Sequence, residues 1–364
     1  MDFAPSPEQA AIVAGVREFV EREMIPVEKE AMANDSLSRE RFLEVSRKAR
    51  QTPYFGPDVP KEVGGQGFPD TTTLLIEMEL LRAFIPGLQV LLLMGIGFMK
   101  GVALLMEGTD EQKRRYLYPT LNDEREGSFA LTEPDAGSDA TTISTVAVRD
   151  GDEWVINGTK TLVNRGTTSD YAMVFCVTDQ EKRARGGISC ILVDKGTPGF
   201  TVSRKIKTIV PADLAEYRFE NCRVPAAALL GPEGQGFQLG MRWISVERLY
   251  AGAYCVGRGT RLVEEATRYV EERQAFGQPL IERQAIQWMI ADSLVDIYTT
   301  KWATLHAGWK SDQGEEVRTE AALVKTIGAQ AVNRIADRMV QLWGGYGVTE
   351  DSPAAMVFRD ARMQ

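Results

Sequence analysis

The sequence predicts an α+β protein in which a helical region, a β region and a second helical region follow one another. Apolar residues recur at helical spacing up to about residue 122, alternate with polar residues after Gly127, and return to helical spacing from Gln235. These changes of period predict three domains, at residues 1–122, 123–235 and 236–364.

The first region opens with a recognisable helix start. Ser6 can cap a helix, Pro7 suits its first position, and Gln9 completes a capping box. The pattern predicts helices at residues 7–20, 38–50, 71–83, 88–106 and 109–121. The longest apolar run, residues 83–99, is shorter than a usual membrane span, so we expect it to be a buried helix and expect no membrane-spanning segment.

The middle and last regions differ in period. Alternating residues predict strands at 141–148, 154–163, 171–177, 188–193, 200–204 and 216–219, which would form a compact β unit. Helices are expected at 236–274, 283–311, 316–343 and from 352 onward. In the third of these, a stripe at helical spacing predicts a core face: Leu323, Ile327, Val332, Ile335, Met339 and Leu342.

Composition excludes several function classes. The 364 residues carry a net charge of −9, which argues against general nucleic-acid binding. The N-terminus resembles no secretory signal, and Cys176, Cys190, Cys222 and Cys255 show no paired spacing, so we expect a cytoplasmic protein without a metal site or disulfides. His306 is the only histidine. Acid–base chemistry must therefore fall to carboxylates, Lys, Tyr or a cofactor.

The stretch GSFALTEPDAGSD, residues 127–139, is the candidate ligand loop. Pro134 favours an extended Glu133, and Gly137 allows backbone to approach a ligand closely. Free N–H groups and hydroxyls nearby would suit a polar ligand, plausibly one with phosphates. An ordinary turn at a strand end would show the same features.

ALTEPDAGSD resembles the flavin-binding signature of the acyl-CoA dehydrogenases. Four more stretches resemble that family in the same order, so the resemblance covers nearly the whole chain: GTDEQKRRYLYPTL, RFENCRVPAAALLGPEGQGF, RQAFGQPLIERQAI and QLWGGYG. The resemblance implies a helical N-terminal domain, a small central β barrel and a C-terminal four-helix bundle. It also implies bound FAD, a homodimer or homotetramer, and an electron-transfer flavoprotein as acceptor.

The resemblance also assigns the FAD contacts. On the β region they are Phe129, Leu131, Thr132, Gly137, Ser138, Leu162 and Asn164. On the last region, Arg273, Phe276 and Gln284 would reach the pyrophosphate and adenosine of the FAD of a neighbouring subunit. The family's other contact on the adenosine side would be made by Gln341, Gly344 and Gly345. The family usually has an aromatic residue at Leu162 and Thr or Ser at Asn164. A branched aliphatic side chain cannot stack like an indole, although the amide can still donate.

The catalytic base has more than one candidate. Many family members use a Glu in an EGT motif that would follow Gln364, where this sequence ends. The isovaleryl and long-chain branches instead use a Glu before a helical Arg, which Glu247-Arg248 matches. The helical neighbours of Glu247 are apolar, so we expect a buried carboxylate that acts as the base, or alternatively a structural ion pair. Glu350 and Asp351 are further candidates, and Ser138, Ser245 and Arg248 would contact the substrate.

The resemblance implies FAD-dependent α,β-dehydrogenation of an acyl-CoA or acyl-carrier thioester. A flavin oxidase, monooxygenase or reductase of the same fold is the first alternative. A binding paralogue without catalysis is the second.

Overall fold

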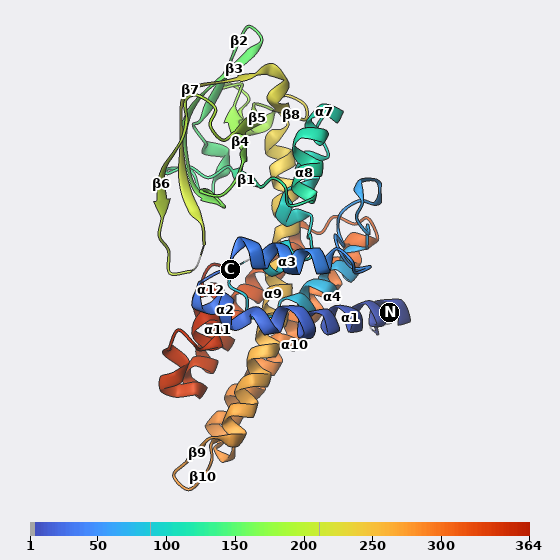
Figure 1. The fold of residues 1–364 in the computed structure, drawn as a ribbon, viewed down its shortest axis with the longest axis vertical. Helices are drawn as coiled ribbons and strands as arrows, with labels where there is room; N and C mark the ends of the chain where they lie inside the picture. The colour runs from blue at the N-terminus through green and yellow to red at the C-terminus, as the bar shows by residue number, and fades with distance from the viewer. Residues whose placement is uncertain (1–3, 88, 211) are drawn as a thin grey trace. The chain divides into compact units, whose positions relative to one another are not determined.

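The computed structural model describes residues 4–87, 89–210 and 212–364, and its fold is shown in Figure 1. The chain divides into two compact units, which we call the helical unit (residues 4–99 and 245–364) and the β unit (residues 100–244). Both ends of the sequence enter the helical unit because they share one apolar core. The division into three domains stays a prediction.

The first helices of the helical unit lie where the sequence predicts most of them. They are α1 (Pro7–Phe19), α2 (Glu28–Ala33), α3 (Arg39–Ala49), α4 (Asp70–Leu80) and α5 (Gln89–Leu93). The predicted capping box is confirmed, since Gln9 N donates to Ser6 Oγ at 3.1 Å and Ser6 N donates to Gln9 Oε1 at 3.0 Å. This start depends on four adjacent residues alone.

The single helix predicted over residues 88–106 is wrong, and residue 88 lies outside the described residues. Helix α5 ends at Leu93, and the chain then turns at Gly95 and Gly101, whose φ angles are +71° and +70°. A Cβ at Gly95 would lie 2.5 Å from the ring of Phe55, so only glycine fits this turn. The apolar run is nevertheless buried, as predicted. Within the described residues, no helix is long and apolar enough to cross a membrane.

The last four helices are confirmed. They are α9 (Gly236–Glu272), which begins in the β unit, α10 (Gln284–Asp312), α11 (Arg318–Trp343) and α12 (Pro353–Ala361). A small hairpin of β9 (Gln274–Ala275) and β10 (Gln278–Pro279) joins α9 to α10 at their ends (Figure 1). The predicted core stripe of α11 is wrong at Leu323, which is exposed, because the neighbouring Val324 faces the core instead.

The β unit starts with short helical segments and then forms one sheet. The helices are α6 (Val102–Leu105), α7 (Asp110–Gln112) and α8 (Tyr118–Leu121). The strands are β1 (Gly127–Ala130), β2 (Val146–Asp150), β3 (Glu153–Asn164), β4 (Tyr171–Val177), β5 (Ile188–Asp194), β6 (Phe200–Ile206), β7 (Leu214–Pro225) and β8 (Leu229–Leu230). The strand predicted from residue 141 starts only at Val146, because residues 140–142 form a short 3-10 turn capped by Asp139.

The sheet follows the order β6-β7-β3-β2-β4-β5-β8, with β1 added to β4. Strand β4 pairs in parallel with β1 and β2 and antiparallel with β5. Its inner side chains form a separate apolar core with those of β3 and β7. In the described part of the chain β6 and β8 do not pair, so the predicted β unit is present as a sheet with two end strands.

Candidate active site

The loop after β1 is held from beneath by a buried ion pair. Lys160 of β3 is completely buried, and its Nζ lies 2.8 Å from Glu133 Oε1 and 2.9 Å from the carbonyl of Leu131. The other donors to the Glu133 carboxylate are the backbone and hydroxyl of Ser144 and the backbone N–H of Thr145. The loop is therefore held in place through Glu133, which an ordinary turn at a strand end would not require.

These contacts set the charge of Glu133. Burial alone would raise the pKa of its carboxyl, but the ion pair with Lys160 and the donors from Ser144 and Thr145 outweigh it and lower that pKa to about 2. The carboxylate is thus ionised at neutral pH. Sequence reasoning missed Lys160, whose only signal was a lysine in an otherwise strand-like segment.

The rest of the loop is presented outward. Gly137 and Ser138 are exposed, Thr132 is half-buried, and the carbonyl of Thr132 accepts from Thr161 N at 2.9 Å. A Cβ placed on Gly137 would meet nothing within 4 Å. Open space therefore lies beside the backbone where the sequence predicts a ligand.

Two of the predicted flavin contacts, Leu131 and Phe129, have side chains that point into the β unit. Leu131 is only 6% exposed, so it offers its backbone and not its side chain. Phe129 is half-buried and stacks on Trp243, with ring centroids 4.5 Å apart, and also meets Phe175. These rings form an apolar wall inside the β unit.

Leu162 has an unusual backbone. Its φ is +53°, and its side chain is 52% exposed even though it lies within β3. A register shift between residues 160 and 163 produces this, because a bulge turns Leu162 outward while Lys160 and Val163 stay buried. Strain of this kind in a non-glycine residue is often found at functional sites.

Asn164 is the last residue of β3, two residues after Leu162. Its Oδ1 accepts from the backbone N–H of Arg165 at 2.9 Å. No described residue accepts from its Nδ2, so the amide keeps donors for a ligand. The side chain is exposed.

Three predicted contacts of the helical unit, Arg273, Phe276 and Gln284, lie on or beside the hairpin between α9 and α10. Arg273 and Gln284 are exposed, and the guanidinium of Arg273 has no hydrogen-bond or ion-pair partner among the described residues. Phe276 is 96% exposed at the tip, with φ +52°, and the guanidinium of Arg283 lies 5.4 Å from its ring. An arginine without a partner among the described residues and an uncovered aromatic ring on the same hairpin suit a ligand or chain from outside this subunit.

Gln341, Gly344 and Gly345 lie at the end of α11 and are all exposed. Gly344 caps the helix with φ +59° and ψ −134°, a conformation available to glycine. The glycine turn therefore ends helix α11 as a C-terminal cap.

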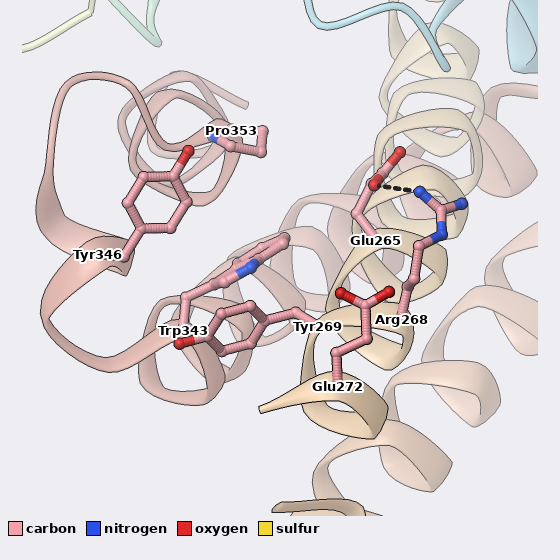
Figure 2. A pocket seen from close by; sticks show the side chains of 7 residues that line it. All are labelled: Glu265, Arg268, Tyr269, Glu272, Trp343, Tyr346 and Pro353. Carbon is pink, nitrogen blue, oxygen red and sulfur yellow. Dashed lines mark hydrogen bonds and ion pairs between the residues drawn. The ribbon is translucent and has the colours of Figure 1, made fainter. Parts of the chain in front are cut away.

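A hollow of about 250 Å³ lies beside this turn. Figure 2 shows the rings of Tyr269 and Trp343 next to each other, with Glu272 near them and Glu265 paired with Arg268. Glu265 is balanced by Arg268, but the second carboxylate, that of Glu272, would repel phosphate, so this hollow does not suit the phosphates of a nucleotide.

Glu247 is less buried than the sequence suggests. Its side chain is 38% exposed, and Lys325 of α11 lies 3.9 Å from Oε1, a weak ion pair at that exposure. Tyr250 and Ala251 are buried as expected, but Trp243 and Ile244 are half-exposed. Glu247 thus lies at the edge of the apolar face and not within it.

The other predicted residues near Glu247 share its helix. Ser245 and Arg248 are half-buried, and no described residue pairs with the Arg248 guanidinium. Glu350 and Asp351 are exposed in the turn before α12. Only Glu247 among these acids adjoins an apolar helix face.

The donor set fits FAD. The β unit offers hydroxyls, exposed backbone and an amide. The helical unit offers Arg273, which has no partner among the described residues and suits phosphate. The four cysteines are buried and free, and the described residues contain no cluster that could hold a metal ion. His306 is exposed on α10.

Comparison with known proteins gives three matches that together span nearly the whole chain. The acyl-CoA dehydrogenase N-terminal domain matches residues 6–124, the middle domain residues 128–222 and the C-terminal domain residues 234–364.

Individual relatives agree with this. The chain is 33% identical to an acryloyl-CoA reductase (NADH) of Anaerotignum propionicum, over all of this chain and 91% of that protein. It is also 33% identical to a short-chain specific acyl-CoA dehydrogenase of Clostridium acetobutylicum, over all of this chain and 94% of that protein. A chain from a structure of an electron transferring flavoprotein of Acidaminococcus fermentans superposes with a TM-score of 0.88 at 30% identity, covering all of this chain and 94% of that one.

The fixed loop, the outward-facing donors around it and the match along the whole sequence lead to one assignment. The chain belongs to the acyl-CoA dehydrogenase family of FAD-dependent oxidoreductases.

Proposed function

We propose that the protein removes two hydrogens from the α and β carbons of an acyl-CoA thioester, with Glu247 as the base. The observation that carries this proposal is the position of Glu247: a carboxylate at the edge of an apolar helix face, followed directly by an arginine without a partner among the described residues. Bound FAD supplies the acceptor for the β hydride.

The residues of this chain divide the remaining work. Glu247 takes the α-proton, and its weak contact with Lys325 leaves it free to do so. Arg248 offers a cation to the phosphates of the CoA moiety, and Ser138 and Ser245 offer hydroxyls. Asn164 donates its amide to the ligand beside the open face of Leu162.

We also propose that the active protein is a homodimer or homotetramer. The hairpin with Arg273 and Phe276 would bind the FAD of a second copy. Helix α10 supports this, because its outer face carries apolar side chains at helical spacing that are more than half exposed: Trp288, Leu294, Val295 and Tyr298. Electrons would leave to an electron-transfer flavoprotein, in line with the structure matched above.

Anaerobic titration of the FAD-loaded protein with a panel of acyl-CoAs tests the activity. The proposal predicts that at least one saturated acyl-CoA bleaches the flavin. If no saturated acyl-CoA does so but an enoyl-CoA reoxidises the reduced protein, the protein is a reductase. Peroxide formation in air would identify an oxidase, and a purified protein that takes up no flavin would be a binding paralogue.

A further inference from the structure

Glu77 of α4 is a buried acid that the proposed chemistry does not use. It is 3% exposed, and none of the described residues donates to its carboxyl or pairs with it. Burial, followed by the neighbouring carboxyls of Asp58 and Asp70, raises the pKa of Glu77 well above its ordinary value. A raised pKa favours the protonated carboxyl, and in that form Glu77 can both donate and accept a hydrogen bond.

Tyr250 of α9 is a second buried polar group. It follows Glu247 by three residues and so lies on the same helix face, one turn further along. Its ring is 3% exposed between Phe98 and Tyr254, and its hydroxyl is buried with no partner in the described structure. A buried hydroxyl without a hydrogen bond costs free energy.

The two groups belong to one contact between helices. A Cβ on Gly257 of α9 would lie 2.5 Å from the carbonyl of Met78, and Arg258 donates to the carbonyl of Ile85 at 2.5 Å. Helix α4 thus packs directly against α9 beside Glu77. Tyr250 also lies within electrostatic reach of both Glu77 and Glu247. Two buried polar groups without a hydrogen-bond partner among the described residues therefore lie on two helices that pack against each other.

We propose that Glu77 and Tyr250 bind a hydroxyl group carried by the acyl chain of the substrate. This rests on the proposed function, because it places the chain along α9 from Glu247. A neutral carboxyl and a phenol both donate and accept, which complements a hydroxyl. The buried Arg258, which lies within electrostatic reach of Tyr250, would repel an ammonium group.

The test compares matched acyl-CoAs that differ only in a terminal group: methyl, hydroxyl, carboxylate or ammonium. The readout is kcat/KM for anaerobic flavin reduction, together with Kd for each ligand. The wild-type protein should prefer the hydroxyl series by about tenfold or more over the methyl series, since a site built to bond a hydroxyl discriminates against its absence.

Three variants sharpen the test. Glu77→Leu and Tyr250→Phe should each reduce the preference for the hydroxyl series about tenfold, whereas Glu77→Gln should keep it, because a neutral amide still donates and accepts. Glu79→Gln is the control on α4, since Glu79 pairs with Arg17 at the surface. Thermal unfolding of each variant confirms that it folds.

The outcomes separate the two levels of the proposal. Equal kcat/KM and Kd for methyl and hydroxyl chains, unchanged in Glu77→Leu, would overturn the role of Glu77 and Tyr250 and leave the dehydrogenase intact. A preference for the carboxylate or ammonium series would also overturn it. If no series bleaches the flavin or binds, the proposed function itself is wrong.

Discussion

The two units treat buried carboxyl groups in opposite ways. In the β unit, Glu133 receives a lysine and three further donors, and its pKa falls to about 2. In the helical unit, Glu77 is equally buried but receives no donor from the described residues, and its pKa rises well above the ordinary value. Burial alone therefore does not mark a functional acid.

The difference extends to the neighbouring residues. The β unit satisfies its buried charges internally and exposes neutral donors around a rigid loop. The helical unit keeps Arg248, Arg273 and Tyr250 without partners in the described structure. We infer that the β unit is a preformed support for the cofactor, while the helical unit depends on ligands and a second copy to complete its polar contacts.

The largest effect should come from removing the buried ion pair between Lys160 and Glu133 in the β unit. Lys160→Met leaves the Glu133 carboxylate buried without its counter-charge, which typically costs about 3–5 kcal/mol of unfolding free energy. Urea unfolding followed by circular dichroism measures it. The double variant Glu133→Gln with Lys160→Met should recover much of the loss, and a single variant as stable as the wild type would contradict the buried pair.

Acid should reproduce part of that loss. Because the folded-state pKa of Glu133 is about 2, below its ordinary 4.5, the ion pair contributes its full stability above about pH 4.5. That contribution, on the order of 3 kcal/mol, should disappear as the pH falls toward 2. Glu133→Gln should flatten the pH dependence of stability in this window, and an unchanged profile would refute the assignment.

In the helical unit, removing Arg273 should have a smaller effect, and this effect should appear in ligand binding. Arg273→Ala removes a charge-assisted hydrogen bond to phosphate, which should weaken FAD binding by roughly tenfold to a hundredfold. Subunit association should weaken with it, as size-exclusion chromatography with light scattering would show. Gln274→Ala, on the same hairpin, is the matched control. Full FAD occupancy in a monomeric variant would contradict the proposal.

Leu162 should give the smallest effect. Leu162→Trp fills the space that its outward side chain leaves open, so preference should shift toward straight acyl chains by roughly tenfold. The measurement is kcat/KM for straight and branched acyl-CoAs of equal carbon number. An unchanged ratio would show that Leu162 does not border the acyl chain.

The sequence predicted helices and strands well where neighbouring residues alone determine them. The capping box at Ser6 and Gln9 involves adjacent residues only, and it is present. The helix over residues 88–106 failed because positive-φ glycines break an apolar run that periodicity alone reads as continuous. The exposure of Leu323 was missed for a related reason, since Val324 fits the same stripe one residue later.

The site was harder to predict because its key contacts are distant in sequence. Nothing near Lys160 indicates that it pairs with Glu133, 27 residues earlier. The bulge that turns Leu162 outward appears only when β3 pairs with β7. Apolar neighbours suggested a buried Glu247, but the helix edge and Lys325 leave it partly exposed. Sequence thus identified the segments of the site better than the environment of each side chain.

The most direct test of the account is rapid mixing of Glu247→Gln with an acyl-CoA that reduces the wild-type flavin. The change keeps the size of the side chain and removes the proton acceptor, so FAD and substrate should still bind. Glu350→Gln and Asp351→Asn serve as controls and should reduce normally. The account predicts that flavin reduction slows by about a hundredfold to ten-thousandfold in Glu247→Gln alone, whereas reduction at a near-normal rate would show that another carboxylate is the base.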